Sequence, residues 1–220
     1  LLAVLTEDQS GLRIGGQYWD AIIWVTAAWN HYLCTNDREF LEKAFEVSSN
    51  SVAYFEKTEF DDKDKLFCGG ACFQDGIAGY PARFADGPGS GILDWVKQHP
   101  PGKEIPGYGL PMKALSTNCL YYNAYQILPC MATELQVPGK PEWSAMAQLL
   151  KDVINNRFWD PERRIYRYLV DASDDAGRHE GFGHAFAILF GIADEDQSKA
   201  IFEHQHITAH GIPCVWPSYK

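Results

Sequence analysis

Residues 18–57 read YWDAIIWVTAAWNHYLCTNDREFLEKAFEVSSNSVAYFEK, and this stretch decides the predicted fold. Up to Leu33 its residues are mostly apolar and aromatic, which predicts a helix that is buried nearly all round. Asn36-Asp37 then stops and recaps the chain, and apolar residues recur at helical spacing from Arg38 to Lys57. The stretch therefore predicts a helical hairpin with a buried first helix and a half-exposed second one.

The same hairpin pattern occurs twice more along the chain. A second pair runs from Ser116 to Leu135, turns through residues 137–139 and returns from Pro141 to Phe158. A third begins near Phe182, recaps at Asp194 and returns with a shorter apolar stripe. In each pair the first helix is the more apolar, as expected of an inner layer that a second layer covers. The pattern predicts an all-α fold, a toroid built from αα-hairpins.

The composition is that of an ordinary soluble globular chain. With 220 residues, 46 % hydrophobic and 22 % charged, the chain is long enough for one domain with a substantial core. The net charge of −10 excludes nucleic acid as the expected partner, because binding to phosphates requires basic residues. No apolar run reaches the roughly 18 residues that cross a bilayer, so no membrane partner is expected. The six cysteines lack the density of a secreted disulfide scaffold, which favours a cytoplasmic location.

The segments that lead into the three inner helices are the candidate functional loops. The stretch from Pro81 to Pro111 is rich in Gly and Pro and too long for a simple connector, so it is predicted to be a functional loop. The segments 15–20, 73–108 and 166–184 would gather at one end of the toroid. Each of them carries an acidic residue beside aromatic residues, namely Asp20, Asp75 and Glu180.

Acidic residues of this kind indicate a glycosidase. Hydrolysis of a glycosidic bond needs one carboxylic acid to protonate the leaving oxygen and a second carboxylate to activate water or attack carbon. Asp75 is the candidate general acid, the alternative being an ordinary turn residue. Glu180 precedes an apolar helix whose macrodipole favours an ionised base, and it is preferred to Asp20 and Asp94. Its alternative is a helix N-terminal acid without a catalytic role.

Two motifs resemble those of a known family. The hairpin of residues 18–41 resembles the six-hairpin glycosidases, most closely the glycogen-debranching amylo-α-1,6-glucosidase and mannosylglycerate-hydrolase-like group. Asn118-Cys119-Leu120-Tyr121-Tyr122-Asn123-Ala124 is similar to a helix motif of that group, and Phe73-Gln74-Asp75-Gly76 is similar to its acid-bearing segment. One departure is Ser116, where the group usually has Glu.

This resemblance implies an (α/α)6 toroid, present here as a partial toroid. Residues 1–220 are then expected to form a single domain that is a fragment of a longer catalytic domain. The implied substrate is an oligosaccharide or glycoside, hydrolysed with inversion and without a cofactor or metal. The rest of the toroid or a second copy of the chain is a further expected partner. Because sugar faces pack on aromatic rings and sugar hydroxyls bind polar groups, the residues expected to bind substrate are Trp19, Asp20, Tyr80, Asn118, Tyr121, His184 and Trp216.

Two other functions remain open on sequence grounds. A sugar 2-epimerase of the N-acylglucosamine type has a similar toroid with histidine acid/base pairs, for which the candidates are His184, His204, His206 and His210. A non-catalytic carbohydrate-binding fragment is the third possibility. Cys68 and Cys72 lack partners at the spacing of a zinc site, so no metal is predicted there.

Overall fold

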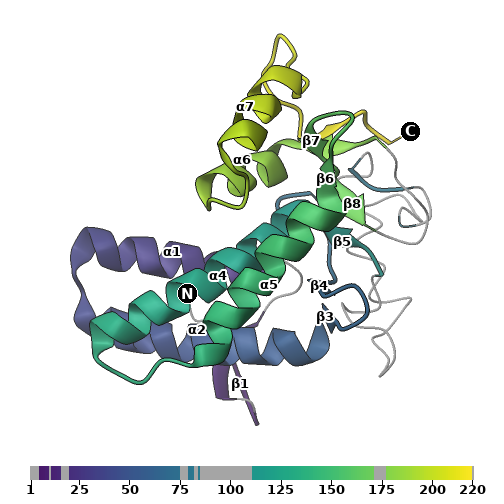
Figure 1. The fold of residues 1–220 in the computed structure, drawn as a ribbon. Coiled ribbons are helices and arrows are strands. Elements are labelled where there is room, and N and C mark those ends of the chain that lie inside the picture. The colour runs from purple at the N-terminus through teal and green to yellow at the C-terminus, as the bar shows by residue number, and fades with distance from the viewer. Residues whose placement is uncertain are drawn as a thin grey trace.

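The computed structural model describes residues 5–9, 11–15, 20–74, 79–81, 84, 111–170 and 177–219 (Figure 1). Within these ranges the helices are α1 (Asp20–Thr35), α2 (Arg38–Thr58), α4 (Leu115–Leu135), α5 (Pro141–Phe158), α6 (Gly181–Leu189) and α7 (Glu195–His204). Ten short strands pair into five two-stranded antiparallel sheets in the same ranges. The pairs are β1 (Leu5–Asp8) with β2 (Gly11–Ile14), β3 (Phe60–Asp61) with β4 (Leu66–Phe67), β5 (Lys113–Ala114) with β8 (Leu169–Val170), β6 (Trp159–Asp160) with β7 (Ile165–Tyr166), and β9 (His179–Glu180) with β10 (Val215–Trp216).

The three predicted helical hairpins are confirmed, and so are two of the caps that delimit them. The Asp37 side chain accepts a hydrogen bond from the Phe40 amide at 3.0 Å and starts α2. Asp194 forms a reciprocal capping box with Gln197 at the start of α7. These side chains satisfy amide groups that have no partner inside their own helices.

The predicted fold class, an all-α partial toroid, is wrong. The described residues contain five small antiparallel sheets in addition to the helices, and no partial toroid is seen in them. The physical reason is that the segments between the helical hairpins carry backbone groups that need partners when they are buried. Strands form within these segments, as in β3–β4 and β6–β7, and between different segments, as in β5–β8 and β9–β10.

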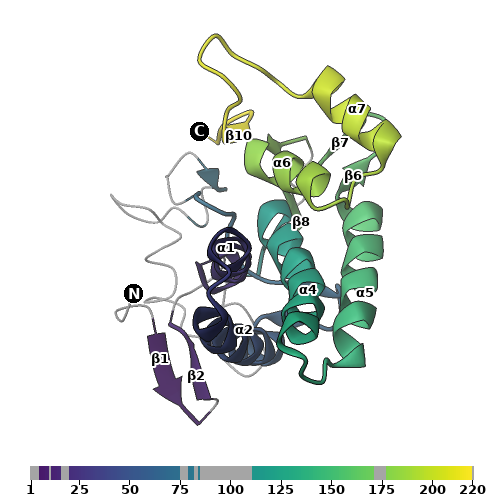
Figure 2. The ribbon, with the colours of Figure 1, turned by 90° about the vertical axis from the view of Figure 1, so that its left-hand side faces the viewer.

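Helix α4 lies at the centre of the molecule. It packs against α1, α2, α5 and α6 (Figure 2), and 15 of its 21 residues are buried. This burial agrees with its apolar composition on all sides. Helix α6 packs against α4, and together with α7 it forms the upper group of helices in Figure 1. No helix in the described ranges has the length and apolar character needed to cross a membrane.

A β-hairpin follows α2 and a matching one follows α5. Residues 60–67 and 159–166 share the pattern aromatic-Asp-x-x-x-basic-aliphatic-aromatic. In both hairpins the aspartate, Asp61 or Asp160, accepts backbone amides of the turn at 2.9–3.1 Å, and the basic residue has φ 55°. The two outer aromatic rings of each hairpin lie 5.0 Å apart. The repeated unit is therefore a helical hairpin followed by a β-hairpin.

Successive units are joined at the starts of α4 and α6. Strand β5 leads into α4 and pairs with β8 of the next unit, and β9 leads into α6 and pairs with β10. The first amide of α4, that of Leu115, donates to the Tyr168 carbonyl at 3.0 Å. The first amide of α6, that of Gly181, donates to the Cys214 carbonyl at 3.1 Å. These bonds fix the helix N-termini around which the candidate site is built.

Candidate active site

Glu180 lies between the N-termini of two helices. It is the last residue of β9 and precedes the first residue of α6. Its side chain is fully buried, and Oε1 accepts a hydrogen bond of 2.6 Å from the amide of Ser116 in the first turn of α4. Gly183 leaves room for this side chain, because a Cβ atom at that position would lie 2.7 Å from Glu180 Cγ. Helix α4 and helix α6 thus share one carboxyl group at their N-termini.

The surroundings of Glu180 favour its neutral form. Burial raises the pKa of the carboxyl group to about 8, and the hydrogen bonds from Ser116 offset this only in part. Oε2 has no hydrogen-bond partner among the described residues. The sequence predicted an ionised base supported by the macrodipole of α6, but the largest influence on the pKa of this carboxyl group is desolvation, which acts in the opposite direction. At neutral pH the carboxyl group is therefore mostly protonated.

The segment that leads to Asp75 meets Glu180 through Ser116. The Ser116 hydroxyl oxygen accepts a hydrogen bond from the amide of Cys72 at 2.9 Å, while the Ser116 amide binds Glu180. The rings of Phe73 and Phe182 add a second contact between the two segments, with centroids 5.3 Å apart. The approaches to both predicted catalytic residues therefore converge at the start of α4.

Asp75 itself lies outside the described residues, but its flanks are close together. A Cβ atom on Gly79 would lie 3.2 Å from Gln74 Oε1. The amide of Ala71 also donates to the hydroxyl group of Tyr80 at 3.0 Å. The described residues on either side of 75–78 thus lie side by side, next to the Cys72 segment that Ser116 holds.

Asn118 and His184 hold the two β-hairpins in the same way. Each is the fourth residue of its helix and is fully buried. The Asn118 side chain accepts from the Phe67 amide at 2.8 Å and donates to the Phe67 carbonyl at 3.0 Å. His184 Nε2 lies 3.0 Å from the carbonyl oxygen of Tyr166, the residue that matches Phe67 in the second β-hairpin. Contact of either side chain with a substrate stays a prediction.

The environment of His184 favours a neutral imidazole. Burial lowers its pKa, although hydrogen bonds to the Tyr166 carbonyl and the Gln205 side chain oppose this. His179, whose ring stacks on His184 at 5.3 Å, has its pKa lowered to about 4, chiefly by burial. Both nitrogens of His184 face protein groups, so a role as an epimerase acid or base would require these contacts to break.

The remaining predicted substrate-binding residues differ in exposure. Tyr80 and Tyr121 are buried, and Tyr121 stacks on Phe67 with ring centroids 3.5 Å apart. Trp216 is 39 % exposed and stacks on His206 at 3.8 Å. Trp19 and the side chain of Asp20 lie outside the described part of the chain. Of the predicted aromatic residues in the described ranges, Trp216 presents the most surface to solvent.

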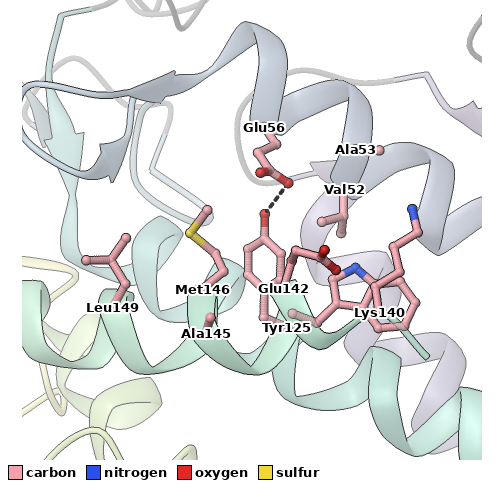
Figure 3. Close-up of a pocket in the computed structure, with 10 residues that line it drawn as sticks. Val52, Ala53, Glu56, Tyr125, Lys140, Glu142, Ala145, Met146 and Leu149 are labelled. Atoms are coloured by element: carbon pink, nitrogen blue, oxygen red, sulfur yellow. Dashed lines mark hydrogen bonds between the residues drawn. The ribbon is translucent and has the colours of Figure 1, made fainter.

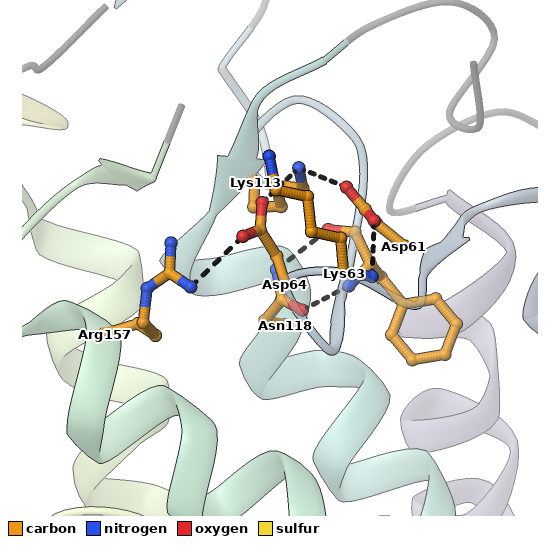
Figure 4. Close-up of polar contacts among 7 residues, drawn as sticks. Asp61, Lys63, Asp64, Lys113, Asn118 and Arg157 are labelled. Carbon is orange, nitrogen blue, oxygen red and sulfur yellow. Dashed lines mark hydrogen bonds and ion pairs between the residues drawn. The ribbon is translucent and has the colours of Figure 1, made fainter. Parts of the chain in front are cut away.

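An ion-pair network anchors the strand that leads into α4 (Figure 4). Lys113 Nζ donates to Asp61 Oδ2 at 2.7 Å and to Asp64 Oδ2 at 2.8 Å, and Arg157 adds a 3.1 Å contact to Asp64. Burial alone would raise the pKa of both carboxyl groups, but the hydrogen bonds and charge of Lys113 outweigh it and lower them. Sequence reasoning missed this network, for which the acidic turn of residues 61–64 is the available signal.

A pocket of about 500 Å³ lies elsewhere, between α2 and α5 and above Tyr125 (Figure 3). Its main polar contact is a 3.1 Å hydrogen bond from the Tyr125 hydroxyl group to Glu56 Oε2. None of the predicted catalytic or substrate-binding residues lines it. The convergence at Ser116 is therefore a better guide to the chemistry than the volume of this pocket.

Two solved structures of glycosidases have a similar fold. A GH78-family rhamnosidase of Bacillus sp. GL1 matches 84 % of this chain at 18 % identity with a TM-score of 0.57. A sialidase matches 90 % of it at 14 % identity with a TM-score of 0.63. The chain spans only 17 % and 16 % of these two proteins. None of the curated protein sequences matches it significantly.

The amino-acid sequence identifies the chain as a glycoside hydrolase domain. Its resemblance to the six-hairpin glycosidases is confirmed by a family match that runs from residue 23 to residue 220. The chain belongs to the mannosylglycerate hydrolase MGH1-like glycoside hydrolase domain family.

Proposed function

We propose that the protein hydrolyses O-glycosidic bonds, with Asp75 as general acid and Glu180 as the second carboxyl group. The observation that carries this proposal is the convergence of the two segments on Ser116 and in the Phe73–Phe182 contact. Membership of a glycoside hydrolase family supports it. Asp75 would protonate the leaving oxygen while a base removes a proton from the attacking water, which gives inversion at the anomeric carbon.

The role of Glu180 as base depends on its ionisation. A general base must be unprotonated, and burial raises the pKa of this carboxyl group to about 8. Asp75 must keep its proton while Glu180 is ionised, so the pH profile reports both groups together. If Glu180 is the base, Glu180→Gln should lose most of the turnover at every pH. A Glu180→Gln variant that keeps its activity would remove Glu180 from proton transfer.

The products formed from glycosides and free sugars distinguish the proposed function from its alternatives. The chain is incubated with nitrophenyl and methyl α-glycosides of mannose, glucose and rhamnose, with branched α-1,6-glucans and with free sugars. Released aglycone or sugar indicates a hydrolase, interconverted free sugar an epimerase, and binding without turnover a carbohydrate-binding module. The anomer formed first, observed by NMR, tests inversion.

The acid role of Asp75 has a sharper test. A general acid contributes about 10²–10⁴-fold to the rate, so Asp75→Asn should lower turnover of methyl glycosides by at least this order. Dinitrophenolate is a leaving group that needs no protonation, so the turnover of dinitrophenyl glycosides should fall far less. Asp196→Asn, at an exposed position in the first turn of α7, is the matched control. An equal loss on both classes of glycoside would contradict an acid role for Asp75.

A further inference from the structure

We propose that Phe73 and Phe182 form an aromatic platform on which the apolar face of a substrate pyranose ring stacks. This inference rests on the proposed function and assigns a substrate contact to the same site. Phe73 lies two residues before Asp75, and Phe182 lies two residues after Glu180. Their ring centroids are 5.3 Å apart with the planes inclined at 55°. The pair thus links the approaches to both predicted catalytic residues.

The backbone of Phe73 has a conformation that its side chain disfavours. Phe73 has φ 57° and is the third residue of the turn that the Gln74 amide closes on the Ala71 carbonyl at 3.2 Å. Gly or Asn usually occupies a position with positive φ in such a turn. The other described non-glycine residues with positive φ are all polar and are Asn36, Lys65, Gln136 and Arg164. An aromatic ring at this position indicates that the side chain itself has a use.

A role in packing the protein core does not explain why residue 73 is a phenylalanine. Phe73 is 50 % exposed although it is large and apolar. Phe182 is partly buried, and its ring continues into a row along α6 with Phe186 at 6.1 Å and Phe190 at a further 5.2 Å. The row contacts the Phe182 ring through Phe186, while half of the Phe73 surface is exposed to solvent. Aromatic faces of this kind suit the C–H groups on one side of a pyranose ring.

Two variants and a control separate sugar binding from folding. Phe73→Gly removes the ring and also relieves the backbone, because Gly adopts positive φ freely. Phe73→Tyr keeps an aromatic face at the same place. Phe202→Ala removes a phenylalanine that is 74 % exposed on α7 and lies outside the proposed platform. Binding is measured by saturation-transfer NMR and titration with methyl α-glycosides of mannose, glucose and rhamnose.

We expect Phe73→Gly to weaken binding of the preferred glycoside by about tenfold or more, with no fall in melting temperature. Phe73→Tyr and Phe202→Ala should bind within about twofold of the wild-type protein. Binding by Phe73→Gly that equals that of the wild-type protein would overturn the platform, and so would a wild-type protein that binds none of these glycosides. Binding that depends on Phe73 but leads to no bond cleavage would support the platform and contradict only the proposed hydrolysis.

Discussion

The amide of Ser116 donates a 2.6 Å hydrogen bond to Glu180 Oε1 across 64 residues of sequence. Ala114, which precedes α4, has no side chain that can cap the helix. Glu180 supplies that cap from the N-terminus of α6, and it satisfies an amide that has no partner within α4. The same carboxyl group therefore stabilises the central helix and lies beside the segment that leads to Asp75.

The buried carboxyl groups should make stability depend on pH between about 6.5 and 8. Burial raises the pKa of Glu180 from 4.5 to about 8, so the native protein keeps a proton that the unfolded chain has released. The free energy of unfolding then falls with rising pH by up to about 1.4 kcal/mol per pH unit for each such group. Glu59, whose pKa burial also raises to about 8, adds a second contribution.

The Glu180→Gln variant isolates one of these contributions. Glutamine is neutral at every pH and keeps an acceptor for the Ser116 amide, so about half of the slope should remain. Urea unfolding at pH 6.5, 7, 7.5 and 8 measures it. Below pH 6.5 the lowered pKa values of His179 and His184 act in the opposite direction, because the unfolded chain then binds more protons. Equal slopes in both proteins would show that Glu180 is not protonated in the native state.

Gly183→Ala should destabilise the protein by about 1–3 kcal/mol, the usual cost of overpacking. The new Cβ atom would lie 2.7 Å from Glu180 Cγ and from Leu115 Cδ2, although alanine favours the helix. Gly139→Ala is the control, because its Cβ atom would have neighbours only at 3.8 Å and beyond. In a double-mutant cycle, Glu180→Ala should reduce the cost of Gly183→Ala. Strict additivity would mean that the two side chains do not compete for this space.

Asn118→Ala should cost about 3 kcal/mol of unfolding free energy, because it leaves buried backbone groups of Phe67 without partners. Asn123→Ala on the same helix removes a single 2.9 Å bond to Thr26 and should cost about 1 kcal/mol. Helix propensity improves equally in both variants, so it cancels in the comparison. Chemical denaturation of the two proteins gives the difference. A similar loss in both would assign Asn118 no special role in holding the β-hairpin.

The helices were predictable because their signals are local. The sequence predicts α5 as Pro141–Phe158 and α2 as Arg38–Lys57, and the structure agrees to within one residue. The β-hairpins were missed because strands of two residues are too short to show the alternation that identifies a strand. Their signal is the eight-residue pattern that residues 60–67 and 159–166 share, which becomes visible only when the two segments are aligned.

The candidate site was predictable in its residue types but not in its electrostatics. Glu180 stands out as an acid before an apolar helix. Its pKa, however, depends on burial against Ser116, which is 64 residues away in the sequence, and on the space that Gly183 leaves for its side chain. Asn118 and His184 stand out as polar residues in apolar helices. Whether such residues face a ligand or the backbone is decided by packing, and here they bind the backbone of the preceding β-hairpin.

Lys113→Met should lower the free energy of unfolding at pH 7 by about 1–3 kcal/mol, because two partly buried carboxylates lose the cation they share and only Asp64 keeps another one, Arg157. The pKa values of Asp61 and Asp64 lie below 3.8 in the folded protein, since hydrogen bonds to Lys113 outweigh burial. Their contribution is present above pH 3.8 and is lost as the pH falls through the folded values. The difference between wild-type and variant proteins should therefore shrink towards pH 2.5.

The control for this prediction is Lys199→Met, which removes an exposed pair with Glu195 and should change stability by no more than about 0.5 kcal/mol. Urea unfolding of the three proteins at pH 7, 4 and 2.5 measures both effects. A loss in Lys113→Met that is the same at every pH would trace the effect to packing of the lysine stem and not to the ion pairs. A loss that fades with acid would show that charge holds β5 against the β3–β4 turn, and with it the start of the helix that carries Ser116.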